Sequence, residues 1–123
     1  MTFSSALLHS PSATNTSTAS LGAGATFAGS CEDVSQFSTV MVEVRADQDS
    51  APLGLVVTFS SLPDQPGAEE RHNVRAGCPK VLQIPCRGSY CRVSYTNGAQ
   101  AQSTFSLQVG YRVHPPSSVA RTE

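Results

Sequence analysis

Apolar and polar side chains alternate without a break from residue 104 to residue 113. The apolar ones fall on every second position: Phe105, Leu107, Val109, Tyr111 and Val113. Because successive side chains of a β-strand point to opposite faces, this period of two predicts a strand with one buried and one solvated face. Residues 90–96 precede it and run into Asn97-Gly98, a pair that tolerates positive φ. We therefore expect these two strands to form a tight hairpin.

The same short period recurs along the chain, and no segment of comparable quality has the period of a helix. Further strands are predicted at residues 25–30, 36–46, 53–60, 71–75 and 81–84. Residues 62–67 contain two prolines and a glycine, which predicts a turn. The pattern thus indicates an all-β, antiparallel, jelly-roll-like β-sandwich of about seven strands. Its predicted core is Val40, Val42, Val44, Leu55, Val57, Phe59, Val93, Phe105, Leu107 and Val109.

One folded domain accounts for most of the 123 residues. Residues 1–24 are rich in Ser, Thr and Ala, and His9 is their one titratable side chain. Such a segment cannot bury enough apolar area to offset the entropy of its own ordering. We therefore expect an extended N-terminal arm at residues 1–24, the sandwich at 25–113 and a tail at 114–123. The arm residues expected to dock on a neighbouring subunit are Phe3, Leu7, Leu8 and Leu21.

Charged residues make up 14% of the chain, against roughly 25% in ordinary soluble domains. The formal net charge is −1, and no basic stripe is present to neutralise phosphates, so nucleic-acid binding is not expected. No apolar run reaches the roughly 18 residues of a membrane-spanning helix, and no membrane partner is expected. The first residues lack the pattern of a signal peptide, so we do not expect export through a standard cleaved signal.

The four cysteines, Cys31, Cys78, Cys86 and Cys91, leave three readings open. In the first reading, all four are reduced core thiols, because free cysteine is among the most buried residues. Alternatively, a turn at residues 87–90 brings Cys86 and Cys91 within disulfide range. A zinc site is the third reading, although the chain has no CxxC motif.

Motifs of catalysis and metal binding are weak in this sequence. No serine lies in a GxSxG elbow, and His72 beside Glu69 and Glu70 is typical of a solvated loop. Asp47 and Asp49 have the spacing that begins a calcium loop, but the glycine and the final glutamate of an EF-hand are missing. We therefore expect no enzyme activity, no cofactor and no metal ion.

Two other short patterns could bind a ligand or a modification. Glu32-Asp33 could join other loop carboxylates around calcium, as in some carbohydrate-binding sandwiches. Asn15-Thr16-Ser17 fits an N-glycosylation acceptor, which we expect to be inert in a protein that is not exported.

The segment GAGATFAGSCEDVSQFSTVMVEVRAD at residues 22–47 resembles the opening of a small β-domain found in tailed-phage and large DNA virus virion proteins. Matching phrases follow in the same order: Gly54-Leu55, Phe59-Ser60, Arg92-Val93, Tyr95-Thr96-Asn97-Gly98, Gln102, Phe105 and Leu107-Gln108. The resemblance covers about residues 19–113. Cys31 stands where this group usually has Trp. The resemblance implies a β-domain of the virion surface, in capsid, tail or fibre, and supplies no catalytic residue.

We therefore expect a structural virion protein that decorates or cements a capsid or forms part of a tail or fibre. Its expected partners are viral capsid or tail proteins and further copies of itself, in a trimer or pentamer. The alternative is a carbohydrate-binding adhesion module on a virion or cell surface. That alternative needs an aromatic platform or a calcium site, and the chain has no Trp.

Overall fold

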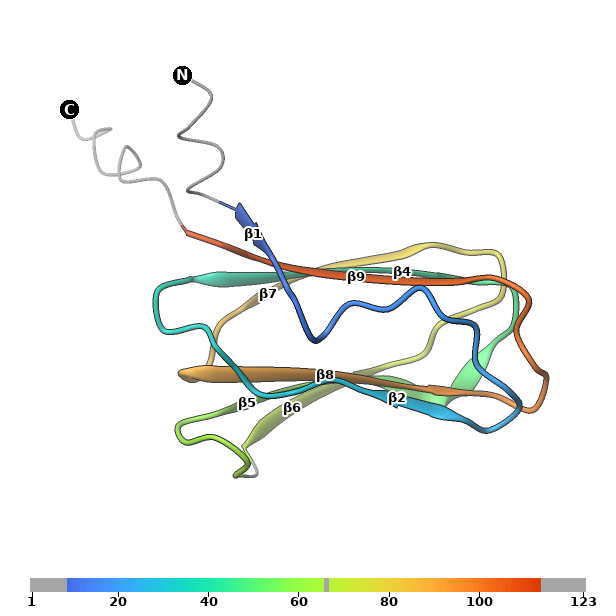
Figure 1. Cartoon of the computed structure of the whole chain (residues 1–123), viewed down its shortest axis with the longest axis horizontal. Helices are drawn as coiled ribbons and strands as arrows, with labels where there is room; N and C mark the ends of the chain where they lie inside the picture. The colour runs from blue at the N-terminus through green and yellow to red at the C-terminus, as the bar shows by residue number, and fades with distance from the viewer. Residues whose placement is uncertain (1–8, 66, 114–123) are drawn as a thin grey trace, which may run out of the picture.

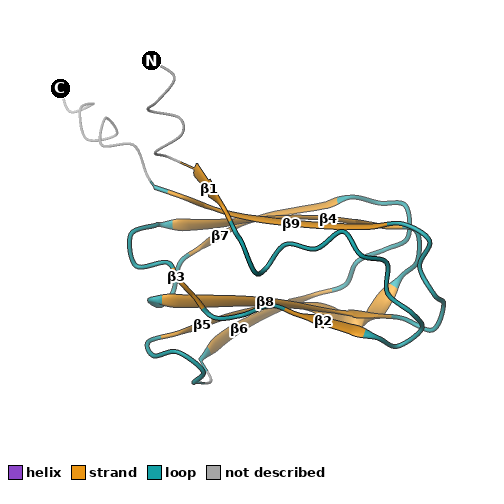
Figure 2. Cartoon of the chain, viewed as in Figure 1, coloured by secondary structure: helices purple, strands orange, loops and turns teal. Residues whose placement is uncertain are grey.

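The computed structural model describes residues 9–65 and 67–113, which form two antiparallel β-sheets packed face to face (Figures 1 and 2). The first sheet has the order β1-β9-β4-β7: β1 (His9–Pro11), β9 (Phe105–Arg112), β4 (Thr39–Ala46) and β7 (Lys80–Pro85). The second has the order β2-β8-β5-β6: β2 (Thr26–Ala28), β8 (Tyr90–Asn97), β5 (Ser50–Ser60) and β6 (Ala68–His72). A further short strand, β3 (Glu32–Asp33), also pairs with β8. The predicted all-β sandwich is confirmed.

The described residues contain no helix, and hence none that is long and apolar enough to cross a membrane.

The core between the sheets consists of the side chains that alternate along the strands. All the core residues predicted from this pattern are buried. Tyr95 of β8 is buried with them, and its ring lies 4.8 Å from the ring of Phe105 in β9, measured between centroids. This contact joins the two sheets. Each fully buried valine or leucine contributes about 1.5–3 kcal/mol of transfer free energy, so the interleaved core is the main stabilising feature of the fold.

The described residues form nine strands rather than about seven. The two additional strands, β1 and β3, are three and two residues long. Strands of this length show too little alternation to be recognised in the sequence. The strand predicted at residues 71–75 lies earlier in the structure, as β6.

The predicted hairpin around Asn97-Gly98 is wrong. β8 pairs with strands of the second sheet and β9 with strands of the first, so the connection crosses from one layer to the other. Gly98 does not adopt positive φ here; its N–H donates to the carbonyl of Asp49 at 3.1 Å. A Cβ at Gly98 would lie 2.5 Å from that carbonyl oxygen. The glycine therefore permits a close backbone approach rather than a hairpin turn.

Residues 9–24, here called the N-terminal strap, differ from the expected free arm because they pack on their own sandwich (Figure 2). β1 pairs antiparallel with the end of β9, and Ser17 exchanges two backbone hydrogen bonds with Leu107, of 2.9 and 2.8 Å. Leu21 packs against the core and exchanges hydrogen bonds with Gln102. Main-chain hydrogen bonds need no apolar side chains, which explains why a segment rich in Ser and Thr is ordered.

The position of the strap changes which residues remain candidates for binding a neighbouring subunit. Leu21 belongs to the protein's own core. Phe3, Leu7, Leu8 and the tail 114–123 lie outside the described residues. An arm for a neighbouring subunit, if formed by the N-terminus, is therefore confined to residues 1–8.

Candidate functional site

Asn15 lies in the middle of the strap and is completely buried. Its Oδ1 accepts a hydrogen bond from the Val93 N–H of β8 at 3.0 Å. Its Nδ2 donates to Tyr111 Oη of β9 at 3.1 Å and to the carbonyl of Ser30 at 3.1 Å. One side-chain amide therefore ties the strap to both sheets.

Glu32 of β3 is the anionic centre of the same cluster. Its Oε1 accepts hydrogen bonds from Asn15 Nδ2 at 3.0 Å and from the hydroxyls of Ser12 and Tyr111. Its Oε2 accepts from the N–H and the hydroxyl of Thr14, at 2.9 and 2.8 Å. We call these five residues, Ser12, Thr14, Asn15, Glu32 and Tyr111, the strap lock. The lock compensates a partly desolvated carboxylate with donors from the strap and from β9.

The pKa values of the lock follow from these contacts. Burial alone would raise the pKa of Glu32, but the hydrogen bonds from Ser12, Tyr111 and Thr14 outweigh it and lower this pKa to about 2. Burial and the hydrogen bond to Glu32 raise the pKa of Tyr111 above its ordinary value. At neutral pH the lock therefore holds an ionised carboxylate and a protonated phenol.

Because the pKa of Glu32 is lowered on folding, the stability of the fold depends on pH in the acidic range. The folded-state pKa of Glu32, about 2, lies below its ordinary value of 4.5. Its stabilisation is therefore complete above about pH 4.5 and is lost as the pH falls towards 2. We expect the urea midpoint of the protein to fall over this range. Glu32→Gln should have a lower midpoint than the wild type at pH 7, and the difference should shrink at pH 3.

Wild type and Glu32→Gln must be compared because the exposed carboxyls of Asp33 and Asp47 also have lowered pKa values. Both of these groups remain in the variant. If the difference in urea midpoint between the wild type and Glu32→Gln were the same at pH 7 and pH 3, the role assigned to Glu32 would be contradicted.

The backbone around the lock is shaped to receive Asn15. A Cβ at Gly29 would lie 1.8 Å from Asn15 Oδ1 and 2.9 Å from the carbonyl oxygen of Val93. Glycine at this position therefore leaves the space that the Asn15 amide occupies. The same burial removes Asn15 from the surface, so the Asn15-Thr16-Ser17 sequence cannot present an accessible glycosylation acceptor in the folded protein.

The acidic residues considered for calcium binding stabilise separate loops. Asp47 accepts hydrogen bonds from the N–H groups of Ser103 and Thr104, and Asp49 accepts from that of Ala76. Asp33 accepts from the N–H of Ser35 at 2.9 Å, as expected for a short acid that caps a turn. No three His, Cys, Asp or Glu side chains within residues 9–65 and 67–113 are grouped as metal ligands.

The four cysteines are free thiols in this structure. Cys86 follows β7 and packs against the core, while Cys91 lies within β8 and is fully buried. Burial, with smaller contributions from Cys86 and Glu32, raises the pKa of the Cys91 thiol to about 12, so this thiol is a poor nucleophile. A Cys86–Cys91 disulfide remains a prediction.

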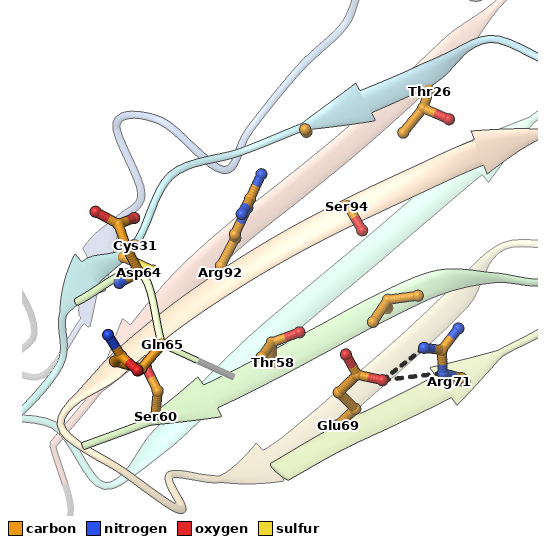
Figure 3. A pocket seen from close by; sticks show the side chains of 12 residues that line it. Thr26, Cys31, Thr58, Ser60, Asp64, Gln65, Glu69, Arg71, Arg92 and Ser94 are labelled. Atoms are coloured by element: carbon orange, nitrogen blue, oxygen red, sulfur yellow. Dashed lines mark hydrogen bonds and ion pairs between the residues drawn. The ribbon is translucent and has the colours of Figure 1, made fainter. Parts of the chain in front are cut away.

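An open groove of about 530 Å³ lies on the solvent-facing side of the second sheet (Figure 3). Small side chains of β2, β5 and β8 form its floor, including Thr58 and Ser94. Glu69 and Arg71 of β6 form an ion pair at 2.6 Å along one side. Asp64 and Cys31 lie together at one end, where the Asp64 N–H is 3.5 Å from Cys31 Sγ. The fold thus has an internal polar cluster and an external polar groove.

The two-sheet sandwich, its strap and its lock define the described part of the chain as an all-β domain, and sequence comparison then identifies the family. Residues 4–112 match the family described as "Uncharacterised protein YqxG N-terminal domain", and the chain belongs to this family. A search of curated protein sequences gives no significant match.

A solved structure shares the fold. The chain superposes on the crystal structure of the PBSX exported protein XepA with a TM-score of 0.66 and 21% sequence identity. This match covers 80% of the present chain and 36% of XepA, so the chain spans about a third of that protein. A protein from Bacillus endospore appendages, described as disulfide-linked pili, matches with a TM-score of 0.48 and 14% identity, over 83% and 92% of the two chains. At 21% identity, the likeness to XepA shows a shared β-sandwich fold.

Proposed function

We propose that this chain is a structural module of a phage-related extracellular or virion particle, and that it acts by binding copies of itself and neighbouring capsid or tail proteins. Family membership and the fold shared with a PBSX exported protein support this class of role. The internal polar groups are engaged in the strap lock, which is a structural use of their chemistry. Binding rather than catalysis is the function this arrangement favours.

The edge strand β7 is the observation that carries the proposal. It pairs with β4 on one side, and no strand among the described residues pairs with its other side. Val81 in this strand is 61% exposed. An open edge of this kind can accept a strand from another chain through main-chain hydrogen bonds.

On the same side of the sandwich, charged side chains protect β6, the edge strand of the second sheet. His72 Nε2 of β6 is hydrogen-bonded to Glu70 Oε1 at 3.2 Å, and Arg87 forms an ion pair with Glu70 at 2.9 Å. Charged side chains of this kind discourage the addition of another strand. Assembly through β7 is therefore favoured over assembly through β6.

In the proposed assembly, a strand from a neighbouring copy or from a capsid or tail protein adds to β7. Residues 1–8, with Phe3, Leu7 and Leu8, are the segment of this chain that we propose as the added strand. Repetition of one weak contact in a closed trimer or pentamer would supply the affinity that a single small domain lacks.

The test compares two lysine substitutions at equally exposed positions. Val81→Lys places a charge on the open edge, whereas Leu62→Lys places one in the β5–β6 turn, where the side chain is also 61% exposed. We expect the wild type and Leu62→Lys to form the same oligomer by analytical ultracentrifugation. Val81→Lys should weaken it by at least about tenfold. A monomeric wild type at high concentration, or equal weakening by both variants, would count against assembly through β7.

A further inference from the structure

The groove on the second sheet combines a hydroxyl-rich floor with charged walls. Thr26, Thr58, Ser60 and Ser94 supply hydroxyls, and Val56 and Ala28 supply apolar surface between them. Thr26 Oγ1 lies 2.9 Å from Thr96 Oγ1 at the far end from Asp64. Surfaces that bind apolar ligands or peptides have a hydrophobic centre. In this groove, hydrogen-bond donors and acceptors are interspersed with the apolar surface.

Arg92 provides the groove with a fixed cation. Its Nε donates to the carbonyl of Gly29 at 3.1 Å, which holds the side chain towards β2. Arg71 is paired with Glu69, whereas no ion pair to Arg92 is formed by any carboxylate of the described residues. Figure 3 shows the Arg92 side chain reaching from β8 towards β2, away from the Glu69–Arg71 pair. The two terminal nitrogens of this guanidinium form a planar donor fork that matches a carboxylate.

The other charges limit what the ligand can be. Glu69 and Arg71 neutralise each other, and Asp64 adds a negative charge at one end. A polyanion would be repelled there, so the groove suits a ligand with one anionic group among many hydroxyls. Acidic side chains such as Asp64 can accept hydrogen bonds from ligand hydroxyls.

From these contacts we propose that the groove binds an acidic sugar, with the carboxylate on Arg92 and the sugar hydroxyls on Thr58, Ser94 and Asp64. The proposal gives the sandwich an adhesion function that needs neither an aromatic platform nor calcium. It does not depend on assembly through β7, because the groove lies on the other sheet. Binding by a single site without aromatic stacking should be weak, with a Kd of about 1 mM.

The experiment measures amide chemical shifts of the full ¹⁵N-labelled chain during titration with an aldotriouronate, a trisaccharide that carries a single uronic acid. The methyl ester of the same trisaccharide keeps the hydroxyls and removes the charge. We expect saturable shifts at β5, β8 and β2 with the acid and a loss of at least about tenfold in affinity with the ester. Acetate and an acidic pentapeptide test whether any carboxylate, or a protein ligand, is sufficient.

Two protein variants complete the test. Arg92→Gln should reduce the affinity for the aldotriouronate by at least about tenfold. Arg45→Gln is the matched control, because Arg45 is an exposed arginine of β4 on the other sheet. Circular dichroism confirms that each variant is folded. Equal binding of acid and ester, an unchanged affinity in Arg92→Gln, stronger binding of the peptide, or no saturable shift up to about 10 mM would each overturn the proposal.

Discussion

Removal of residues 1–24 is expected to leave a chain that no longer holds its native tertiary structure, whereas removal of residues 1–8 should leave a folded sandwich. The longer deletion removes the pairing of β1 with β9 and all the donors that the strap gives to Glu32. Each hydrogen bond to a charged group contributes about 1.5–3 kcal/mol, and the lower end of this range applies to Glu32 because it is only partly buried. The main-chain hydrogen bonds of the strap add about 1 kcal/mol each. The total approaches the roughly 5–15 kcal/mol stability of an ordinary domain.

The measurement is cooperative thermal unfolding followed by near-ultraviolet circular dichroism, with amide dispersion in ¹H–¹⁵N spectra as a second readout. The deletion of residues 1–8 is the matched control, because it removes none of the contacts described above. From the sequence alone, residues 1–24 look dispensable for folding, so this result distinguishes the strap from a free arm. A cooperative transition at the wild-type temperature in the longer deletion would show that the strap is not needed.

Asn15→Ala is expected to lower the free energy of unfolding by about 3–5 kcal/mol. The variant leaves the Val93 N–H and the Ser30 carbonyl without their side-chain partner and removes one donor from Glu32. Because the site is fully buried, water cannot replace these hydrogen bonds without reorganisation. Urea unfolding at pH 7 measures the change.

Asn73→Ala is the matched control for this substitution. Asn73 is exposed and accepts one hydrogen bond, from the N–H of Leu53 at 2.7 Å. We expect its replacement to cost less than about 1 kcal/mol. If the two asparagines proved equally costly, the stabilisation would not arise from the buried lock.

The sequence pattern predicted the two sheets and their core because alternation directly reports which face of a strand is buried. Val40, Val42 and Val44 show this in β4, as do Leu107 and Val109 in β9. It could not predict which sheet each strand joins. Asn97-Gly98 is a pair typical of hairpin turns. The side-chain amide of Asn97, however, donates hydrogen bonds to the carbonyls of Leu21, Gly22 and Gln100. A long-range anchor therefore overrode the local turn preference.

The strap lock was missed for a related reason. Asn15 stands in a Ser- and Thr-rich segment, and its burial depends on Val93 and Tyr111, which are far away in the sequence. Glu32 did carry a signal, since it is two residues from the buried Val34 and can share its face. Acidic residues are rarely buried without hydrogen-bond partners. The partly buried position of Glu32 is therefore explained only by the donors of the strap.

The hydrogen bond between Asn15 and Tyr111 spans 96 positions of the chain, and this separation sets the order of folding events during synthesis. At about 5–20 residues per second, Asn15 leaves the ribosome roughly 5–20 s before Tyr111 does. During that interval, β9 is not yet available to pair with β1 or β4. The nascent chain therefore cannot complete its first sheet until β9 has been synthesised, and contacts of such long sequence separation are typical of slow-folding β-proteins.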